Sequence, residues 1–181
     1  MRFSLKPFPG TGNPAGVSIG GSIARRRDAL SVRYEVRGNL SELSIRPAVE
    51  PPGRRDRLWE DTCLELFLGT ADCGGYWEFN LSPAGHWNAY RFTGYRGEMR
   101  EEAAFTSLPL AVRIGRNALE LSIELPVGKI IRAEGTIQAG VAAVVKTVNG
   151  GTSHWAQTHP GPRPDFHRRE NFALEFPPKA G

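Results

Sequence analysis

The sequence predicts an all-β domain of two packed, mainly antiparallel sheets with at most one or two short helices, forming a single domain over residues 1–181. Two observations carry this prediction. Apolar residues recur at every second position in short segments, which is the period of a half-buried strand. Gly, Pro and Asn separate these segments, and the 3.6-residue period of an amphipathic helix is nearly absent.

The strands follow one another along most of the chain. In 118–125, for example, Leu and Ile alternate with Glu and Ser, as expected when one face of a strand is buried. The turn pair Gly38 and Asn39 predicts that 30–36 and 40–45 form a hairpin, and one short helix is expected within 126–132. The expected strands are residues 30–36, 40–45, 62–68, 76–81, 86–92, 110–114, 118–125, 138–148, 152–157 and 171–176.

Residues 62–68 are expected to form a central strand, because both faces of this segment are apolar except at Glu65. A buried carboxylate needs compensation. We therefore expect Glu65 to bond to backbone donors or to an arginine such as Arg91. Residues 48–57 and 159–169 are long enough to be functional loops.

The formal net charge of +4 includes Arg clusters at 25–27, 54–57 and 168–169. Acidic residues are interspersed with them, and no nucleic-acid-binding motif accompanies the clusters, so they are interpreted as solvated loop charges and no nucleic-acid partner is expected. No apolar run is long enough to span a membrane, and Pro7 and Pro9 interrupt the N-terminal segment, so neither a membrane partner nor a signal peptide is expected. With Cys63 and Cys73 interpreted as a reduced pair, a cytoplasmic location is expected.

The segment 58–68, LWEDTCLELFL, resembles the signature strand of the family 9 carbohydrate-binding modules and their DOMON-like relatives. In these proteins a Trp-Glu-(Asn/Asp) turn leads into a strand that carries a Glu. The resemblance continues at 76–85, YWEFNLSPAG, at 87–92, WNAYRF, and towards the C-terminus at 154–160, 164–167 and 172–176. The chain looks closest to bacterial DOMON-like proteins that have no assigned ligand.

This resemblance implies a two-sheet, jelly-roll-like sandwich with a groove that binds a saccharide or a glycan-like ligand without catalysis. In the carbohydrate-binding members two aromatic rings sandwich a sugar, while carboxylates and amides bind its hydroxyls. Trp59 matches one ring, and Phe166 or His167 stands at about the place of the other. An equally weighted interpretation is that Trp59 caps the edge of the core.

The other tryptophans lie in expected strands, where core packing is the more frequent role. Trp87 alone stands next to a turn and is kept as a candidate, with polar residues that suit sugar hydroxyls or a Ca²⁺ ion. The ligand-binding residues predicted are Trp59, Glu60, Trp87, Asn88, Asp165, Phe166 and His167.

Two alternatives remain open, and no cofactor is assigned. His154, His159, Asp165 and His167 have side chains that bind Zn²⁺ or Fe²⁺, although their spacing matches no familiar metal motif, and they are also the candidates for an enzyme. DOMON relatives hold haem through Met and His, but Met99 lies in a charged segment. Residues 16–20 fit G-x-S-x-G without the strand and helix that a nucleophile elbow requires, so no catalytic residue is assigned. The sequence does not define the oligomeric state.

Overall fold

The computed structural model describes residues 1–13, 15–47 and 51–178, and residues 48–50 of the expected loop 48–57 fall outside these ranges. The described residues form twelve strands and four single turns of 3-10 helix, without an α-helix. The strands are β1 (Arg2–Pro7), β2 (Ser18–Arg26), β3 (Ala29–Arg37), β4 (Cys63–Thr70), β5 (Tyr76–Leu81), β6 (Trp87–Phe92), β7 (Arg100–Glu101), β8 (Leu110–Ile114), β9 (Ala118–Leu125), β10 (Ile137–Lys146), β11 (Thr152–Ala156) and β12 (Leu174–Phe176). The 3-10 turns are η1 (Leu40–Glu42), η2 (Leu58–Glu60), η3 (Val127–Lys129) and η4 (Arg169–Asn171).

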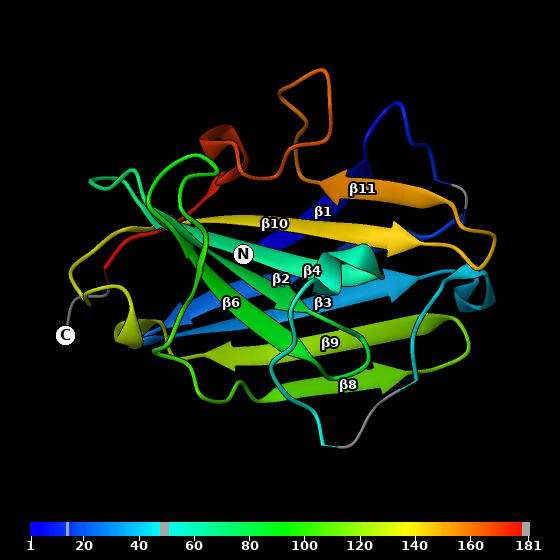
Figure 1. Ribbon diagram of the computed structural model, residues 1–181, viewed down its shortest axis with the longest axis horizontal. Coiled ribbons are helices and arrows are strands. Elements are labelled where there is room, and N and C mark those ends of the chain that lie inside the picture. Colours follow the sequence, from blue (N-terminus) through cyan, green and yellow to red (C-terminus); the bar gives the residue numbers. More distant parts are fainter. Residues whose placement is uncertain (14, 48–50, 179–181) are drawn as a thin grey trace.

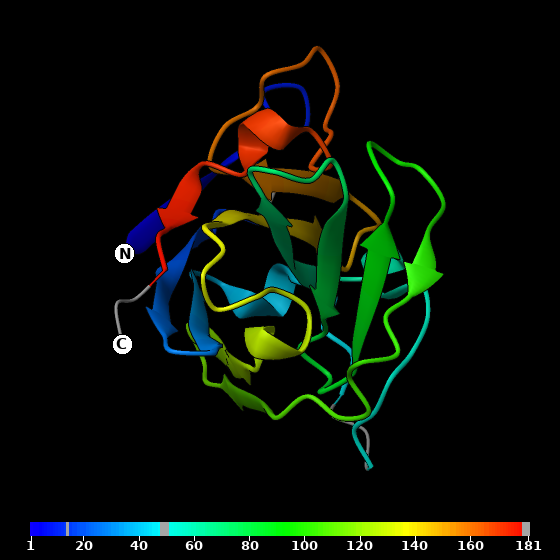
Figure 2. The same cartoon turned by 90° about the vertical axis from the view of Figure 1, so that its left-hand side faces the viewer.

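The strands curl into two layers that share one strand. Sheet A has the order β1-β2-β3-β9-β8, and sheet B has the order β7-β6-β5-β4-β10-β11 with β12 also paired to β10. β1 joins the layers, because residues 2–5 pair with β2 whereas Lys6 and Pro7 pair with β11. All pairings between the named strands are antiparallel. Figure 2 shows the layers closing around a common interior, and the predicted all-β, mainly antiparallel sandwich is confirmed.

The inner faces of the two sheets form the main core. The predicted alternation in β9 is present, since Leu119, Leu121, Ile123 and Leu125 are buried. Leu66 and Phe79 of sheet B are fully buried against this layer. Burial of apolar surface is the main force that holds the layers together.

One expectation about the first 45 residues is wrong, and two strands there were not predicted. Residues 40–45 do not form a hairpin strand: the side chain of Asn39 accepts a hydrogen bond from the amide of Ser41, which caps the turn η1. β3 pairs instead with β2 and β9. β1 and β2 were not predicted; in β2 the adjacent Gly20 and Gly21 interrupt the apolar alternation. The short helix expected in 126–132 is present as η3.

The outer faces of the two sheets have different environments. In β3 of sheet A, outward residues such as Arg33 are exposed, whereas sheet B carries a second apolar cluster on its outer face. The segment that contains η4 lies over this face (Figure 1). Gly140 of β10 permits this approach, because a Cβ there would lie 2.9 Å from the main-chain oxygen of Asn171. No helix among the described residues has the length and apolar character needed to cross a bilayer.

Candidate functional site

The outer face of sheet B carries a row of polar side chains across neighbouring strands. In the register of the sheet, Ala142 of β10 stands opposite Glu65 of β4, Glu65 opposite Asn80 of β5, and Asn80 opposite Asn88 of β6. Strand partners of this kind project to the same face of a sheet. Three of these four residues are polar, and all four are buried.

The next row is aromatic and acidic. Phe67 of β4 stands opposite Glu78 of β5, and Glu78 stands opposite Tyr90 of β6. Phe166 and Phe172 from the C-terminal segment belong to the same cluster as Phe67 and Tyr90. The segment that contains Phe166 and Phe172 therefore covers part of the outer face of sheet B. The row that contains Glu78 lies beside the edge of this segment.

A pocket of about 380 Å³, called here the sheet B pocket, opens at this edge. Its walls come from the outer face of sheet B, from the turn η2, from the connection between β6 and β7, and from the loop after β11. The residues that line it are Trp59, Glu65, Glu78, Phe92, Arg96, Met99, Val144, His154, Pro164, Asp165, Phe166 and His167.

The turn η2 places Trp59 at the pocket. Arg57 before the turn has a left-handed backbone with φ of 58°, and the chain then makes one 3-10 turn through Leu58–Glu60. The partly buried indole contacts the ring of Tyr90 edge to face, with 5.7 Å between ring centroids. The hydroxyl of Tyr90 donates to Asp56 at 2.5 Å, so the loop before Trp59 is tied to β6 as well.

Asp165 connects the two loops of the pocket wall. Its carboxylate accepts hydrogen bonds from the hydroxyl of Tyr95 at 2.5 Å, from the guanidinium of Arg96 at 3.1 Å and from the amide of His167 at 3.2 Å. Burial would raise the pKa of Asp165, but these donors and the charge of Arg96 lower it below the ordinary value. Asp165 is therefore an ionised anchor between loops.

His167 lies between Tyr76 and Glu78. Its Nδ1 is 2.7 Å from the Tyr76 hydroxyl, and its Nε2 is 3.9 Å from a Glu78 carboxylate oxygen. Burial, with a smaller contribution from Arg96, lowers the pKa of His167 to about 4. The imidazole is accordingly neutral near pH 7 and contributes a polar ring rather than a cation.

Two buried carboxylates line the base of the pocket. Burial and the neighbouring Glu78 raise the pKa of Glu65 well above its ordinary value. Burial raises the pKa of Glu78 to about 7, although the amide of Asn80, which donates to it at 2.8 Å, opposes the shift. Two carboxylates in such a site retain a proton more readily than free ones.

The expectation that Glu65 is buried is confirmed, since it is 3% exposed. The expected arginine partner is wrong: the guanidinium of Arg91 lies 5.8 Å from the ring centroid of Trp77 instead. Among the described residues no hydrogen-bond donor or salt-bridge partner of the Glu65 carboxylate is found. Its oxygens are acceptors that face the pocket.

The structure brings together four of the seven predicted ligand-binding residues: Trp59, Asp165, Phe166 and His167 all line the sheet B pocket. Glu60 does not line it; its carboxylate is exposed and pairs with Arg57.

The placement of Trp87 and Asn88 in the groove is wrong. Trp87 is 3% exposed and packs in the core between the sheets, because it alternates with the outward Asn88. Asn88 is fully buried: its oxygen accepts from Arg54 at 2.6 Å, and its amide donates to Tyr90 and Glu101.

Reasoning from sequence missed other residues of the pocket, notably Phe92, Arg96 and Val144. It also gave Glu65 a structural role. The available signal was strand parity, because Glu65 and Glu78 stand on the same face as the aromatic residues of their strands.

The four residues of the metal or enzyme alternative do not gather. His154, Asp165 and His167 line the pocket, but His159 lies elsewhere, with its Nε2 2.9 Å from the Lys6 carbonyl oxygen and its ring against Phe8. Within the part of the chain that the structure describes, no group of three or more His, Cys, Asp or Glu side chains is arranged to hold a metal ion.

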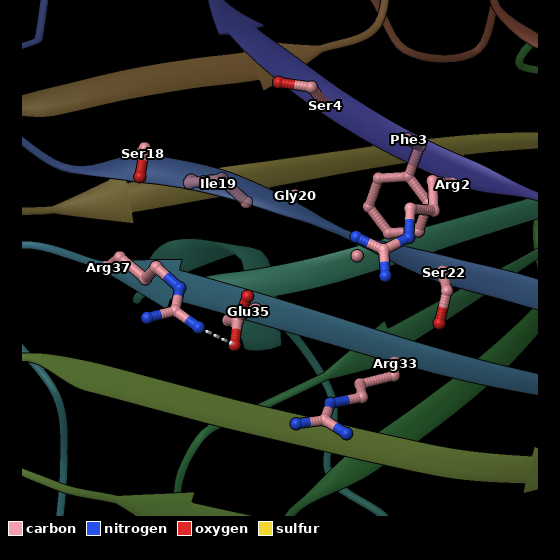
Figure 3. Close-up of a pocket in the computed structure, with 11 residues that line it drawn as sticks. Arg2, Phe3, Ser4, Ser18, Ile19, Gly20, Ser22, Arg33, Glu35 and Arg37 are labelled. Carbon is pink, nitrogen blue, oxygen red and sulfur yellow. Dashed lines mark hydrogen bonds and ion pairs between the residues drawn. The ribbon is translucent and has the colours of Figure 1, made fainter.

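A larger hollow of about 530 Å³ lies on the outer face of sheet A (Figure 3). It is open and polar, and three of its four charged residues are paired: Arg37 bonds to Glu35, and Arg33 bonds to Glu120 outside the hollow, each at 2.6 Å, whereas Arg2 has no such partner among the described residues. The aromatic ring that lines it, Phe3, is only 7% exposed. This hollow is less suited to an organic ring than the sheet B pocket.

No family model and no curated protein sequence matches the chain. Among solved structures, the fold is similar to that of a "putative carbohydrate-binding protein" from Bacteroides uniformis, with a TM-score of 0.74 and 16% sequence identity over 96% of this chain and 84% of that chain. A family 9 carbohydrate binding module from Caldicellulosiruptor kristjanssonii, in complex with glucose, aligns with a TM-score of 0.47 and 11% identity over 83% of this chain and 71% of that one. The same module in complex with cellotriose gives the same score and identity, with 70% of that chain covered. At 16% identity the likeness to the Bacteroides protein is evidence for the fold alone.

Proposed function

We propose that the chain is a non-catalytic binding module that holds a saccharide in the sheet B pocket. One observation carries the proposal: the partly buried ring of Trp59 lines the same pocket as the buried carboxylates of Glu65 and Glu78. A sugar ring has an apolar C–H face and a polar edge of hydroxyls. It therefore requires an aromatic surface and hydrogen-bond acceptors in one cavity.

Other features of the pocket support this proposal. A volume of about 380 Å³ falls within the range of about 300 to 1,000 Å³ that is usual for small-molecule sites. Phe166 and His167 supply further rings from the loop after β11, and Asp165 ties this loop to Tyr95 and Arg96. A wall held in this way needs little ordering when a ligand binds.

The similarity of fold to the Bacteroides protein agrees with a saccharide ligand, but a shared fold is by itself a weak argument for function. The residues of the pocket are the stronger support.

A binding assay with neutral and charged mono- and oligosaccharides tests the proposal, using calorimetry or amide chemical shifts of the labelled protein. We expect a saccharide to bind and to shift the amides near Trp59 and His167. The variant Ile114→Ala should bind the saccharide as the wild type does, because Ile114 is 50% exposed on the edge strand β8 of sheet A, away from the pocket. Shifts confined to the hollow of sheet A would contradict the proposed site.

The same sample separates the alternatives. Met99 lines the pocket together with the two histidines, so a Soret band in the purified protein would favour haem over a saccharide. A stoichiometric metal in elemental analysis would favour a metal site.

A further inference from the structure

The charges of the sheet B pocket do not balance. Its lining contains three carboxylates, Glu65, Glu78 and Asp165, and one guanidinium, that of Arg96. Asp165 bonds to Arg96 at 3.1 Å and also lies 3.7 Å from the Nε of Arg168, which is outside the lining. The two histidines of the lining have lowered pKa values, so they add no positive charge near pH 7. Burial raises the pKa of both Glu65 and Glu78, so near pH 7 this pair retains protons and carries only part of its formal negative charge; the charge that it does carry has no bonded counter-ion among the lining residues.

The hydrogen bonds of this pair leave acceptors free. Glu78 accepts from Asn80, whose own oxygen is 3.6 Å from the thiol of Cys63. The Tyr34 hydroxyl donates to the main-chain oxygen of Glu65, not to its carboxylate. A carboxylate offers about four acceptor positions. Glu65 is only 3% exposed. The oxygens of Glu65 face the pocket, so a ligand donor placed there can reach them.

The walls beside the pair consist of groups that suit a cation. Trp59, Phe92 and Phe166 present aromatic rings to the pocket, and Met99 adds a polarisable thioether. Aromatic faces attract ammonium groups electrostatically, and the attraction grows when the site is shielded from water. Rings and uncompensated carboxylates in one cavity favour a positively charged group over a neutral one.

We infer that the sheet B pocket selects an amine-bearing saccharide, whose ammonium group lies against Glu65 and Glu78. This inference rests on the proposed function for the sugar and adds the class of sugar. An ammonium group offers three donors, and its positive charge favours the ionised form of the two carboxyls. The hydrogen bonds then become charge-assisted and about twice as strong as neutral ones. A sugar acid, in contrast, would bring a further negative charge to the pair and be repelled.

Four monosaccharides that share a pyranose ring test the inference at pH 7: glucosamine, glucose, N-acetylglucosamine and glucuronic acid. Calorimetric titration of the wild-type protein is expected to give about a tenfold lower Kd for glucosamine than for glucose or N-acetylglucosamine, and the weakest binding for glucuronic acid. The comparison within the wild-type protein does not depend on the folding of any variant.

The variant Glu78→Gln keeps the shape of the side chain and removes its charge. Its preference for glucosamine over glucose should fall to less than about threefold, while Glu175→Gln, which removes a carboxylate of β12 outside the pocket, should retain the preference. Cyclohexylamine serves as an amine without hydroxyls.

The outcomes separate the two proposals. Glucose that binds as tightly as glucosamine, or a preference that survives in Glu78→Gln, would overturn the amine inference and leave the saccharide proposal standing. Cyclohexylamine that binds while all four sugars fail would overturn the saccharide proposal. Failure of all five compounds would overturn both.

Discussion

The hydroxyl of Tyr34 donates a hydrogen bond to the main-chain carbonyl of Glu65 at 2.5 Å, and so connects sheet A to the strand that carries the base of the pocket. Tyr34 belongs to β3 and is fully buried between the layers. Burial, with a smaller contribution from the negative charge of Glu65, raises the pKa of its phenol well above the ordinary value, which keeps the donor protonated. The bond fixes the backbone of β4 at the residue whose side chain faces the pocket.

The variant Tyr34→Phe should therefore destabilise the domain by about 1 to 2 kcal/mol, because it removes a buried donor and leaves its acceptor without that bond. Urea unfolding followed by fluorescence measures the difference. Tyr95→Phe is the comparison, since it also removes a hydroxyl donor, here to Asp165, but from a residue that is 61% exposed, where the loss should cost less than about 0.5 kcal/mol. Equal stability of Tyr34→Phe and the wild type would show that this bond does not hold the layers together.

Trp59→Ala should weaken saccharide binding at least tenfold while lowering the free energy of unfolding by less than about 1.5 kcal/mol. The indole is only partly buried, against Tyr90, so its loss leaves no closed cavity. Trp87→Ala is the opposite case. It removes a side chain that is 3% exposed in the main core and should cost about 3 to 5 kcal/mol. Titration and urea unfolding of both variants check the pair. Unchanged sugar affinity in Trp59→Ala would remove Trp59 from the site.

The fold could be predicted where apolar alternation is regular, as in β9, and where both faces of a short segment are apolar, as in β4. The prediction failed where small residues or a capping side chain override the alternation. Gly20 and Gly21 interrupt the apolar pattern of β2, and Asn39 caps the turn η1 where a strand was expected. Alternation describes the burial of one face, and a strand rich in glycine gives little such signal.

The candidate site could be predicted only in part, because it combines segments far apart in the sequence. The resemblance to carbohydrate-binding modules indicated Trp59 and residues 165–167, which do line one pocket. Whether the carboxylate oxygens of Glu65 are free depends on the hydrogen bonds that its neighbours across the sheet make. That information is present in the register of β4, β5 and β10 and absent from any single segment. For Trp87, the parity of β6 could have shown that it shares the inner face with Ala89.

Glu78→Gln should stabilise the protein increasingly as the pH rises from about 4.5 to about 7. The pKa of Glu78 rises from an ordinary 4.5 to about 7 in the folded protein, so over this interval the folded state binds more protons than the unfolded state. The free energy of unfolding of the wild type then falls as the pH rises, and glutamine removes this contribution. The lowered pKa of His167 acts in the opposite direction below pH 6.5 and is common to both proteins.

Urea unfolding of the wild type and of Glu78→Gln at pH 4.5, 5.5, 6.5 and 7.5 isolates the contribution of Glu78. The difference in unfolding free energy should be smallest at pH 4.5 and level off above about pH 7. Glu175→Gln should show no such trend, because Glu175 is exposed. A difference independent of pH would mean that Glu78 has the same pKa in the folded and the unfolded protein.

Asp165→Asn should loosen the pocket wall without unfolding the domain. Asparagine keeps one acceptor oxygen but loses the charge that pairs with Arg96 and one of the oxygens shared among Tyr95, Arg96 and the amide of His167. We expect hydrogen exchange at the amide of His167 to accelerate about tenfold and saccharide affinity to fall several-fold. The free energy of unfolding at pH 7 should change by less than about 1.5 kcal/mol, since the carboxylate lies near the surface, 15% exposed.

The pH dependence of this variant has the opposite sign to that of Glu78→Gln. The pKa of Asp165 is lowered in the folded protein, so its stabilising effect is fully present above the ordinary value of 3.8 and is lost as the pH falls through the folded pKa. The difference between the wild type and Asp165→Asn should therefore shrink on acidification below pH 4. Exchange at His167 as slow as in the wild type would show that other contacts hold the loop after β11, and Asp165 would then have no positioning role in the pocket.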